Sequence, residues 1–281
     1  MKVVTSVRGM QRLAEAWRRQ GRRIGFVPTM GCLHVGHLSL IRIAKQRSDI
    51  VVVSIFVNPT QFGPKEDFKR YPRDITRDKK LAAGAGCDVL FVPRTQDMYP
   101  QGYATYVTVE GLSKGLCGRS RPTHFRGVTT VVAKLFHIVN PHLAVFGQKD
   151  AQQAVILQRM AGDLNFDTRI LVAPIVREKD GLAMSSRNVY LSTGARKQAL
   201  VLSRALGKAK QMVSKGERKA SVIKNTVIQL IRGAEDGVID YVEVVHPETL
   251  EDLTLLEDRA LVALAVKFGS TRLIDNTLIK V

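Results

Sequence analysis

Short apolar runs alternate with amphipathic helical patterns through roughly the first 175 residues of the chain. Such alternation predicts an α/β fold with a doubly wound parallel sheet. In sheets of this kind, ligands bind beyond the carboxyl ends of the strands. The loops that follow the strands are therefore where a site is expected. The predicted strands are 23–27, 50–57, 89–92, 143–146 and 167–172, and the predicted helices are 38–46, 75–83, 127–138 and 151–160.

The pattern changes after Asp180-Gly181. Two long helical patterns come first, and three strand-like runs follow them. This order predicts a smaller α+β domain that acts as a lid. We expect the first domain to span 1–176 and the second 177–281. The helical patterns of the second part are 195–214 and 220–232, and its strand-like runs are 241–245, 260–266 and 271–274.

The formal net charge is +18, which raises the question of a nucleic-acid partner. The basic residues are spread along the chain, and aromatic residues make up only 6% of it, none of them interleaved with the basic clusters. A base-stacking surface requires that interleaving. Solvated helix faces therefore explain the charge better, and a positive field that attracts an anionic substrate fits the same pattern.

Other bulk features narrow the class of protein further. The longest apolar stretches are strand-sized, so no membrane span is expected. Residues 1–5 lead into charge rather than into a long apolar segment, which argues against a secretory signal. The cysteines Cys32, Cys87 and Cys117 form no C-x-x-C pair, which predicts free thiols in a reducing cytoplasm.

The segment His34-Val35-Gly36-His37 is the most informative motif of the chain. An apolar strand leads through a glycine-containing loop into a helix start, and two imidazoles three residues apart share one helix face. First-turn N–H groups attract anions, and Gly36 leaves room for a flat ligand. The motif predicts a nucleotide triphosphate site. The alternative, surface or core histidines, is disfavoured by this context, and two ligands do not complete a zinc shell.

Two further strand ends offer polar groups. Asn58 and Gln61 supply neutral donors and acceptors suited to a buried carboxylate or hydroxyl, although a simple Asn-Pro turn is the alternative. In the segment 146–153, Lys149 suits phosphate, Asp150 suits a helix N-cap, and Gln153 lies one turn further. Here the alternative is an ordinary capped helix with an extended lysine.

Two loops are candidates for contacts with polyphosphate. The basic loop 119–127 either neutralises the anion or is merely solvated. The loop 181–188 combines small and hydroxyl residues with Arg187, so it can close over a triphosphate, or it is only a linker. Neither the P-loop pattern nor the G-x-G-x-x-G fingerprint occurs in the chain.

Together these segments resemble the pantothenate synthetase (pantoate–β-alanine ligase) family, within the H-x-G-H nucleotidylyltransferase superfamily with its Rossmann-like core. The matching strings cover nearly the whole chain, at 28–38, 51–61, 71–73, 121–127, 147–153, 180–188 and 272–276. The resemblance implies ATP-dependent condensation of (R)-pantoate with β-alanine to pantothenate, a coenzyme A precursor. A pantoyl adenylate would form, with release of pyrophosphate and then AMP. It further implies ATP as co-substrate, Mg²⁺, a homodimer, and neither nucleic acid nor membrane as a partner.

The resemblance also assigns residues by motif position. Catalysis is assigned to His37, His34 and Lys149. Gln61 and Gln153 are assigned to pantoate, with Gln61 also near β-alanine, and Asn58 is added as a substrate-binding candidate from its own chemistry. Asp78 is the one candidate metal ligand, with Mg²⁺ bound mainly through ATP phosphates. The residues assigned to ATP are Met30, Gly31, Cys32, Leu33, His34, Val35, Gly36, His37, Gly147, Gln148, Lys149, Asp150, Val176, Met184, Ser185, Ser186 and Arg187.

Some positions depart from the family pattern. Gln148 replaces a usual glutamate and Ala151 an aromatic residue, while Val35 and Cys117 stand where acidic residues are common. An acidic pair often placed near the metal is Arg77-Asp78 here. Two other functions remain open from the residues alone. They are another H-x-G-H nucleotidylyltransferase with a different acceptor, and a basic nucleic-acid-binding protein.

Overall fold

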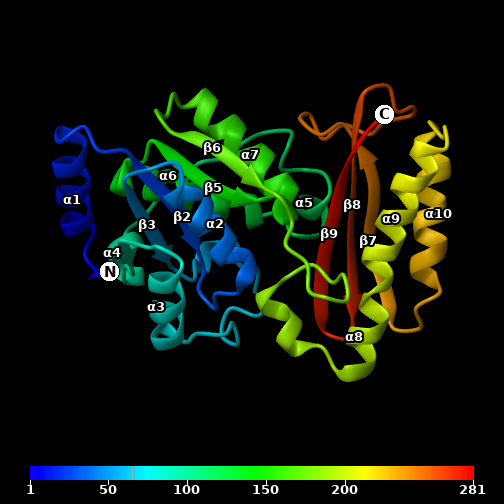
Figure 1. Cartoon of the computed structure of the whole chain (residues 1–281), viewed down its shortest axis with the longest axis horizontal. Helices are drawn as coiled ribbons and strands as arrows, with labels where there is room; N and C mark the ends of the chain where they lie inside the picture. The colour runs from blue at the N-terminus through cyan, green and yellow to red at the C-terminus, as the bar shows by residue number, and fades with distance from the viewer. Residues whose placement is uncertain (65) are drawn as a thin grey trace.

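The computed structural model describes residues 1–64 and 66–281, and within them six parallel strands form one sheet (Figure 1). Their order is β1-β4-β3-β2-β5-β6, so the chain moves outward from β2 in both directions. The prediction of a doubly wound parallel sheet is confirmed. The strands are β1 (Lys2–Val4), β2 (Ile24–Thr29), β3 (Ile50–Ile55), β4 (Val89–Phe91), β5 (Leu143–Gly147) and β6 (Arg169–Ala173).

The central strands are mostly apolar because both faces of the sheet are covered, and their polar residues Thr29 and Ser54 are buried near the carboxyl ends. Phe26 of β2 and Val52 of β3 pack on one side, and Val27 and Val53 pack on the other. Continuous apolar runs are typical of parallel strands between helical layers. Since the strands run parallel, β2, β3 and β5 deliver their following loops to one edge of the sheet.

Helices cover both faces, as Figure 1 shows. The layer that contributes Met10, Phe136 and Ile156 to the core consists of α1 (Val7–Arg19), α6 (His124–Val139) and α7 (Ala151–Asp163). The opposite layer contributes Ile41 and Ala82 from α2 (Val35–Lys45) and α3 (Ile75–Gly84). The chain also contains the short helices α4 (Thr95–Met98), α5 (Cys117–Ser120), η1 (Pro59–Gln61), η2 (Gln148–Asp150) and η3 (Ser186–Tyr190).

The C-terminal sheet consists of antiparallel strands in the order β7-β8-β9. Alternation along β7 sends Tyr241 and Val245 toward the parallel-sheet part, whereas Val242 and Val244 pack against the helices. The sheet therefore lies between the rest of the chain and the layer of α9 and α10 (Figure 1). The elements are α8 (Thr193–Ala199), α9 (Val201–Ser214), α10 (Ala220–Arg232), β7 (Gly237–Val245), β8 (Arg259–Phe268) and β9 (Thr271–Lys280). The division at 176/177 stays a prediction.

Three differences from the predicted elements have identifiable causes. Strand β1 and helix α1 were not predicted, and β1 is only three residues long and pairs with β4 alone. The predicted helix 195–214 is two helices, which meet at Leu200. Strand β9 extends past its predicted end at residue 274 because Asp275, Asn276 and Thr277 are polar yet buried, which hides the apolar pattern.

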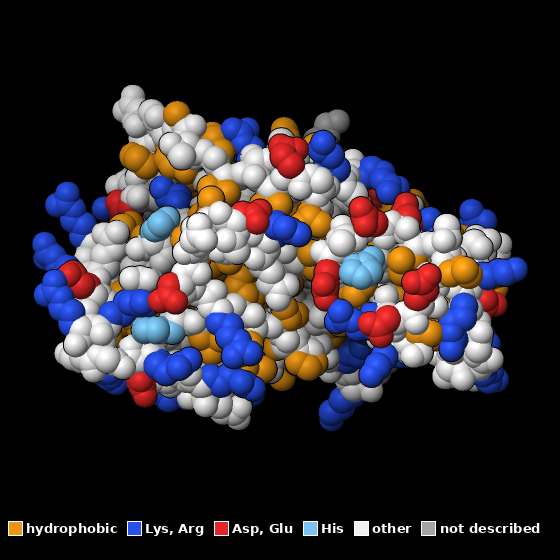
Figure 2. Space-filling model, turned by 90° about the horizontal axis from the view of Figure 1, so that it is seen from above, with side chains coloured by type: hydrophobic (Ala, Val, Ile, Leu, Met, Phe, Trp, Pro, Cys, Tyr) orange, Lys and Arg blue, Asp and Glu red, His pale blue; other side chains and the backbone are white. Residues whose placement is uncertain are grey.

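Lys and Arg side chains are spread over the face shown in Figure 2, with Asp and Glu between them. They do not collect there into one stripe. This distribution agrees with the interpretation of the +18 charge as mainly solvated surface. None of the described helices has the length and apolar character needed to cross a membrane.

Candidate active site

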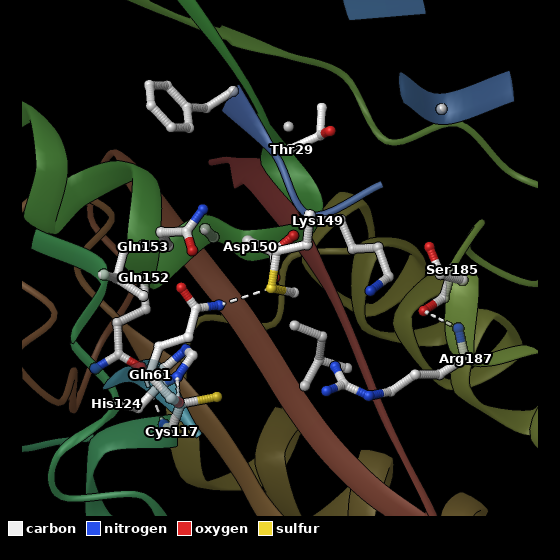
Figure 3. A pocket seen from close by; sticks show the side chains of 18 of the residues that line it. Thr29, Gln61, Cys117, His124, Lys149, Asp150, Gln152, Gln153, Ser185 and Arg187 are labelled. Carbon is white, nitrogen blue, oxygen red and sulfur yellow. Dashed lines mark hydrogen bonds between the residues drawn. The ribbon is translucent and has the colours of Figure 1, made fainter. Parts of the chain in front are cut away.

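A cavity of about 280 Å³ lies where the loops after β2, β3 and β5 meet the C-terminal sheet. It brings together most of the residues that the sequence motifs pointed to, from four separate segments (Figure 3). In Figure 3, Gln61 and Gln153 lie to one side of Lys149, and Ser185 and Arg187 lie to the other. The predicted residues that line the cavity are Met30, His34, Gly36, His37, Asn58, Gln61, Gly147, Lys149, Asp150, Gln153, Val176, Met184, Ser185, Ser186 and Arg187.

The two imidazoles lie against each other at the start of α2, with ring centroids 4.0 Å apart. His34 is the N-cap, and its backbone N–H donates to Nδ1 of His37 at 3.3 Å. A neutral ring that accepts at Nδ1 carries its proton on Nε2. A Cβ on residue 36 would lie 2.9 Å from the His34 ring. Gly36 therefore makes room for the His34 ring, and because it also lines the cavity, its expected contact with a flat ligand stays a prediction.

Both rings are held neutral. Burial, with a smaller contribution from the Lys149 ammonium, lowers the pKa of His34 to about 4. Burial also lowers the pKa of His37 well below its ordinary value, and His34 and Lys149 add to this effect. Near neutral pH these rings therefore act as N–H donors rather than as cations. Lys149 is then the cation of this cluster.

The loop before His34 is held by the carboxylate of Asp78. The backbone N–H groups of Cys32 and Leu33 each donate to one of its oxygens, both at 2.7 Å. Gly31 and Cys32 adopt left-handed backbone angles, with φ of +84° and +49°. These two contacts stabilise a conformation that costs a non-glycine residue free energy. The N–H groups of Cys32 and Leu33 are thus committed to Asp78 and not presented to phosphate.

The same contacts argue against Asp78 as a metal ligand. Its side chain is 2% exposed, and both oxygens already accept backbone N–H groups. Within residues 1–64 and 66–281, no group of three or more His, Cys, Asp and Glu side chains is placed to hold a metal ion. The donor set therefore does not fit a magnesium ion held by the protein.

The loop after β3 holds its amides in a buried network. Asn58 donates to Oε1 of Gln61 at 3.1 Å and to the Gly127 carbonyl at 3.0 Å. Its Oδ1 accepts from the hydroxyl of Tyr99 at 2.8 Å. With these contacts Asn58 is 1% exposed and orients Gln61, whose Nε2 lies 3.1 Å from the sulfur of Met30. The two alternatives from the sequence therefore both apply, because the Asn-Pro turn is the segment that places Asn58 and Gln61 in the cavity lining.

The loop around η3 covers the H-x-G-H segment from the other side. Ser186 donates to the Cys32 carbonyl at 3.1 Å. Arg187 forms two hydrogen bonds to the carboxylate of Asp67, at 2.9 and 2.8 Å. The guanidinium expected on phosphate is therefore paired with Asp67 in this structure.

Arg121 and His124 are among the cavity residues to which the sequence analysis gave no individual role. Arg121 pairs with Glu66 at 2.7 Å through Nε, and Nδ1 of His124 lies 2.9 Å from the Gln61 carbonyl. Burial and the Arg121 charge lower the pKa of His124 to about 4. Both belong to the loop 119–127, which the sequence marked only as basic, so this part of the loop is not simply solvated. The ion pair with Glu66 has no local sequence signal because the partners are far apart in the chain.

Some predicted ATP residues do not belong to the cavity lining formed by the described residues. Leu33 is fully buried, Val35 is 54% exposed, and Gln148 turns its amide to Asn276 of β9. Gly31 and Cys32 shape the loop beneath the imidazoles. Cys32 and Leu33 support the cavity through the backbone bonds that fix this loop to Asp78.

The neutral histidines predict that stability falls as the pH drops below about 6.5. The pKa values of His34 and His124 are about 4 when folded and about 6.5 when unfolded. The unfolded chain therefore binds more protons between these values, and the free energy of unfolding decreases as pH falls from about 6.5 toward 4. Urea unfolding at about pH 7, 6 and 5 measures this slope.

The His124→Gln variant supplies the comparison, because glutamine cannot take up the proton. Its slope in the same pH range should be smaller than that of the wild-type protein. Equal slopes would show that His124 is not held neutral by the fold. Glu66 and Asp67, whose pKa values their arginine partners lower, add their own loss of stability only below about pH 4.5.

The chain as a whole is similar to known proteins of one family. The family model for pantoate–β-alanine ligase matches residues 2–278. The pantothenate synthetase of Acetivibrio thermocellus is 56% identical over 281 residues, covering all of both chains. The crystal structure of the pantothenate synthetase from Thermus thermophilus has a TM-score of 0.94 at 46% identity, covering 99% of each chain. A Francisella tularensis pantoate–β-alanine ligase, described as complexed with β-γ ATP and β-alanine, has a TM-score of 0.82 at 33% identity over 99% of this chain and 97% of that one.

Proposed function

Since the chain belongs to the pantoate–β-alanine ligase family and condenses pantoate with β-alanine using ATP, we propose that the reaction runs in two steps through a pantoyl adenylate. First, a carboxylate oxygen of pantoate attacks the α-phosphorus of ATP and pyrophosphate leaves. Next, the amine of β-alanine attacks the acyl carbon and AMP leaves with that oxygen, while the nitrogen loses its proton. Both steps need positioned groups and protection from water more than covalent help.

The observation that supports this proposal most strongly is the convergence of unlike groups on one cavity. Lys149 and the imidazoles of His34 and His37 line one part of it, and the amides of Gln61 and Gln153 line another. Negative charge grows on the departing pyrophosphate, so a fixed cation and N–H donors there lower the barrier. Amides suit the carboxylate and hydroxyl groups of pantoate because they both donate and accept.

The proposal gives each of these side chains a role in the reaction. Lys149 offers its ammonium to the phosphates as a point charge. His37 offers its Nε2 proton, because Nδ1 accepts the His34 N–H. Arg187 exchanges Asp67 for phosphate when ATP binds, and the loop 184–187 then shields the adenylate from water.

Magnesium is assigned to the nucleotide. We propose that Mg²⁺ enters with ATP and is bound through phosphate oxygens, since Asp78 is committed to the backbone of Cys32 and Leu33. Bound in this way, the ion neutralises phosphate charge. The homodimer, the lid role of residues 177–281 and the cytoplasmic location stay proposals as well. Sedimentation of the purified chain tests the first of these.

Gln61→Ala is expected to weaken pantoate use selectively. Loss of the amide that Asn58 orients should raise the KM for pantoate about tenfold or more, with the KM for ATP changed less than about threefold. Steady-state AMP release, with each substrate varied in turn, measures both constants. Gln211→Ala on the exposed side of α9 is the matched control and should behave as wild type. An unchanged KM for pantoate would refute the assignment of Gln61.

Pyrophosphate exchange separates the proposed function from other H-x-G-H chemistry. Labelled pyrophosphate should enter ATP only when pantoate is present, and β-alanine should not be needed. Exchange that depends instead on a phosphorylated sugar or on a pantetheine acceptor would contradict the proposal. A salt-sensitive affinity for nucleic acid without ATP binding would support the non-enzymatic alternative.

A further inference from the structure

We propose that Asn276 of β9 is a positioning residue for adenylate formation, because it holds the loop that presents Lys149. The proposal rests on the role proposed above for Lys149. In this proposal the C-terminal sheet does more than cover the phosphate site, because its strand β9 also holds the loop that carries Lys149.

The contacts of Asn276 reach across the junction between the two sheets. Its Nδ2 donates to the carbonyl of Gln148 at 2.9 Å and to that of Lys149 at 3.0 Å. The residue is 2% exposed, so water does not compete for these bonds. Both protons of one side-chain amide are thus used on consecutive peptide groups of η2.

The orientation of this amide is fixed by its surroundings. Gln148 donates from Nε2 to Oδ1 of Asn276 at 3.0 Å, so the oxygen and the nitrogen of Asn276 cannot exchange places without losing bonds. The backbone N–H of Asn276 donates to Asp275, which in turn forms two hydrogen bonds with Arg177 at 2.7 and 2.9 Å. Each donor and acceptor of the Asn276 side chain therefore has a partner. A glutamate at position 148 could not donate the hydrogen bond that Gln148 gives to Oδ1 of Asn276.

The Lys149 loop depends on this support. Helix η2 has no side-chain hydrogen bond at its N-cap, and a Cβ placed on Gly147 would meet nothing within 4 Å among the described atoms. The lysine side chain has several rotatable bonds, so the position of its backbone decides where the ammonium can reach. Loss of the two bonds to β9 would let the loop shift, and small misplacements of catalytic groups have large effects on rate.

The test compares Asn276→Ala and Asn276→Asp in the full chain. Asparagine-to-aspartate keeps the shape but directs a carboxylate at two carbonyl oxygens. Pantoate-dependent pyrophosphate exchange should fall about tenfold for the alanine variant and further for the aspartate variant. The KM for pantoate should change less than about twofold, since Gln61 and Gln153 are not touched. Thr277→Val, the neighbouring buried position on β9, is the matched control and should exchange like wild type.

A double-mutant cycle decides whether Asn276 acts through Lys149. The variant lacking both side chains, Asn276→Ala with Lys149→Ala, should be no slower than Lys149→Ala alone. Multiplicative losses would overturn the proposal. Gln148→Ala, which removes only the partner of Oδ1, should show a smaller loss and covers the case in which Asn276→Asp fails to fold.

The remaining outcomes separate this proposal from the function on which it rests. If Lys149→Ala is slow while folded Asn276 variants exchange at the wild-type rate, the proposal for Asn276 is overturned and the role of Lys149 stands. If Lys149→Ala itself exchanges normally, the phosphate role of Lys149 fails and the positioning role fails with it. Thermal melting of each variant establishes that the compared proteins are folded.

Discussion

Lys149→Ala is expected to slow pantoate-dependent pyrophosphate exchange by about 10²–10³-fold, because it removes the cation from the cluster that faces the leaving pyrophosphate. The imidazoles of His34 and His37 cannot replace it, since burial, the largest cause of their lowered pKa values, keeps them neutral without Lys149. Lys149→Met should be equally slow, because it keeps the length of the side chain without its charge.

The matched control for charge is Lys197→Ala. This lysine is exposed on α8, outside the cavity, and its removal lowers the net charge by the same single unit. Its exchange rate should stay within about twofold of wild type if local charge matters and the overall field does not. Equal losses in Lys149→Ala and Lys197→Ala would show that the general positive field, and not the loop after β5, assists the reaction.

His37→Ala is expected to lower the exchange rate by about 10²-fold. The reason is geometric: Nδ1 is occupied by the His34 N–H, so Nε2 is the donor that His37 can offer to phosphate. His37→Gln, which keeps a terminal N–H donor, should recover part of the rate. Single-turnover formation of acyl adenylate measures the step directly.

The shape of the pH profile is a second readout for His37. A ring that works as a neutral donor has no titration between about pH 6 and 8, so the wild-type rate of adenylate formation should show no histidine-like inflection there. Near wild-type rates in both His37 variants would contradict its assigned role. A rate that rises on acidification through that range would indicate a protonated ring.

The main sheet was predictable because its strands are buried on both faces. Runs such as Ile50–Ile55, in which Ser54 is the one polar residue, are recognisable from their apolar content alone. Strand β1 was missed because three residues cannot display a period. The end of β9 was missed because its buried residues are polar, and their partners lie on other elements.

The site residues that could be predicted are those whose motifs directly follow a strand of the parallel sheet. Lys149, Gln61 and the two imidazoles each follow a strand of one parallel sheet, so topology alone brings them to one edge. The sequence did not reveal what each polar group already binds. Asp78 faces two backbone N–H groups and Arg187 faces Asp67, and such distant pairings leave no local pattern.

Gly36 shows the same limit at a single residue. The sequence did not reveal that its lack of a side chain also makes room for the His34 ring that packs against it. The ring pair is then fixed before any substrate enters, with His37 oriented by the His34 backbone. This preorganisation matches a reaction in which donors must be in place when charge develops.

The most direct test of the two-step account follows one oxygen atom. Pantoate labelled with oxygen-18 in its carboxylate is incubated with ATP, Mg²⁺ and β-alanine, and the products are examined by mass spectrometry. Formation of a pantoyl adenylate predicts one labelled oxygen in AMP, because the attacking carboxylate oxygen leaves with the phosphorus. Unlabelled AMP, or labelled inorganic phosphate formed together with ADP, would contradict adenylation at this site.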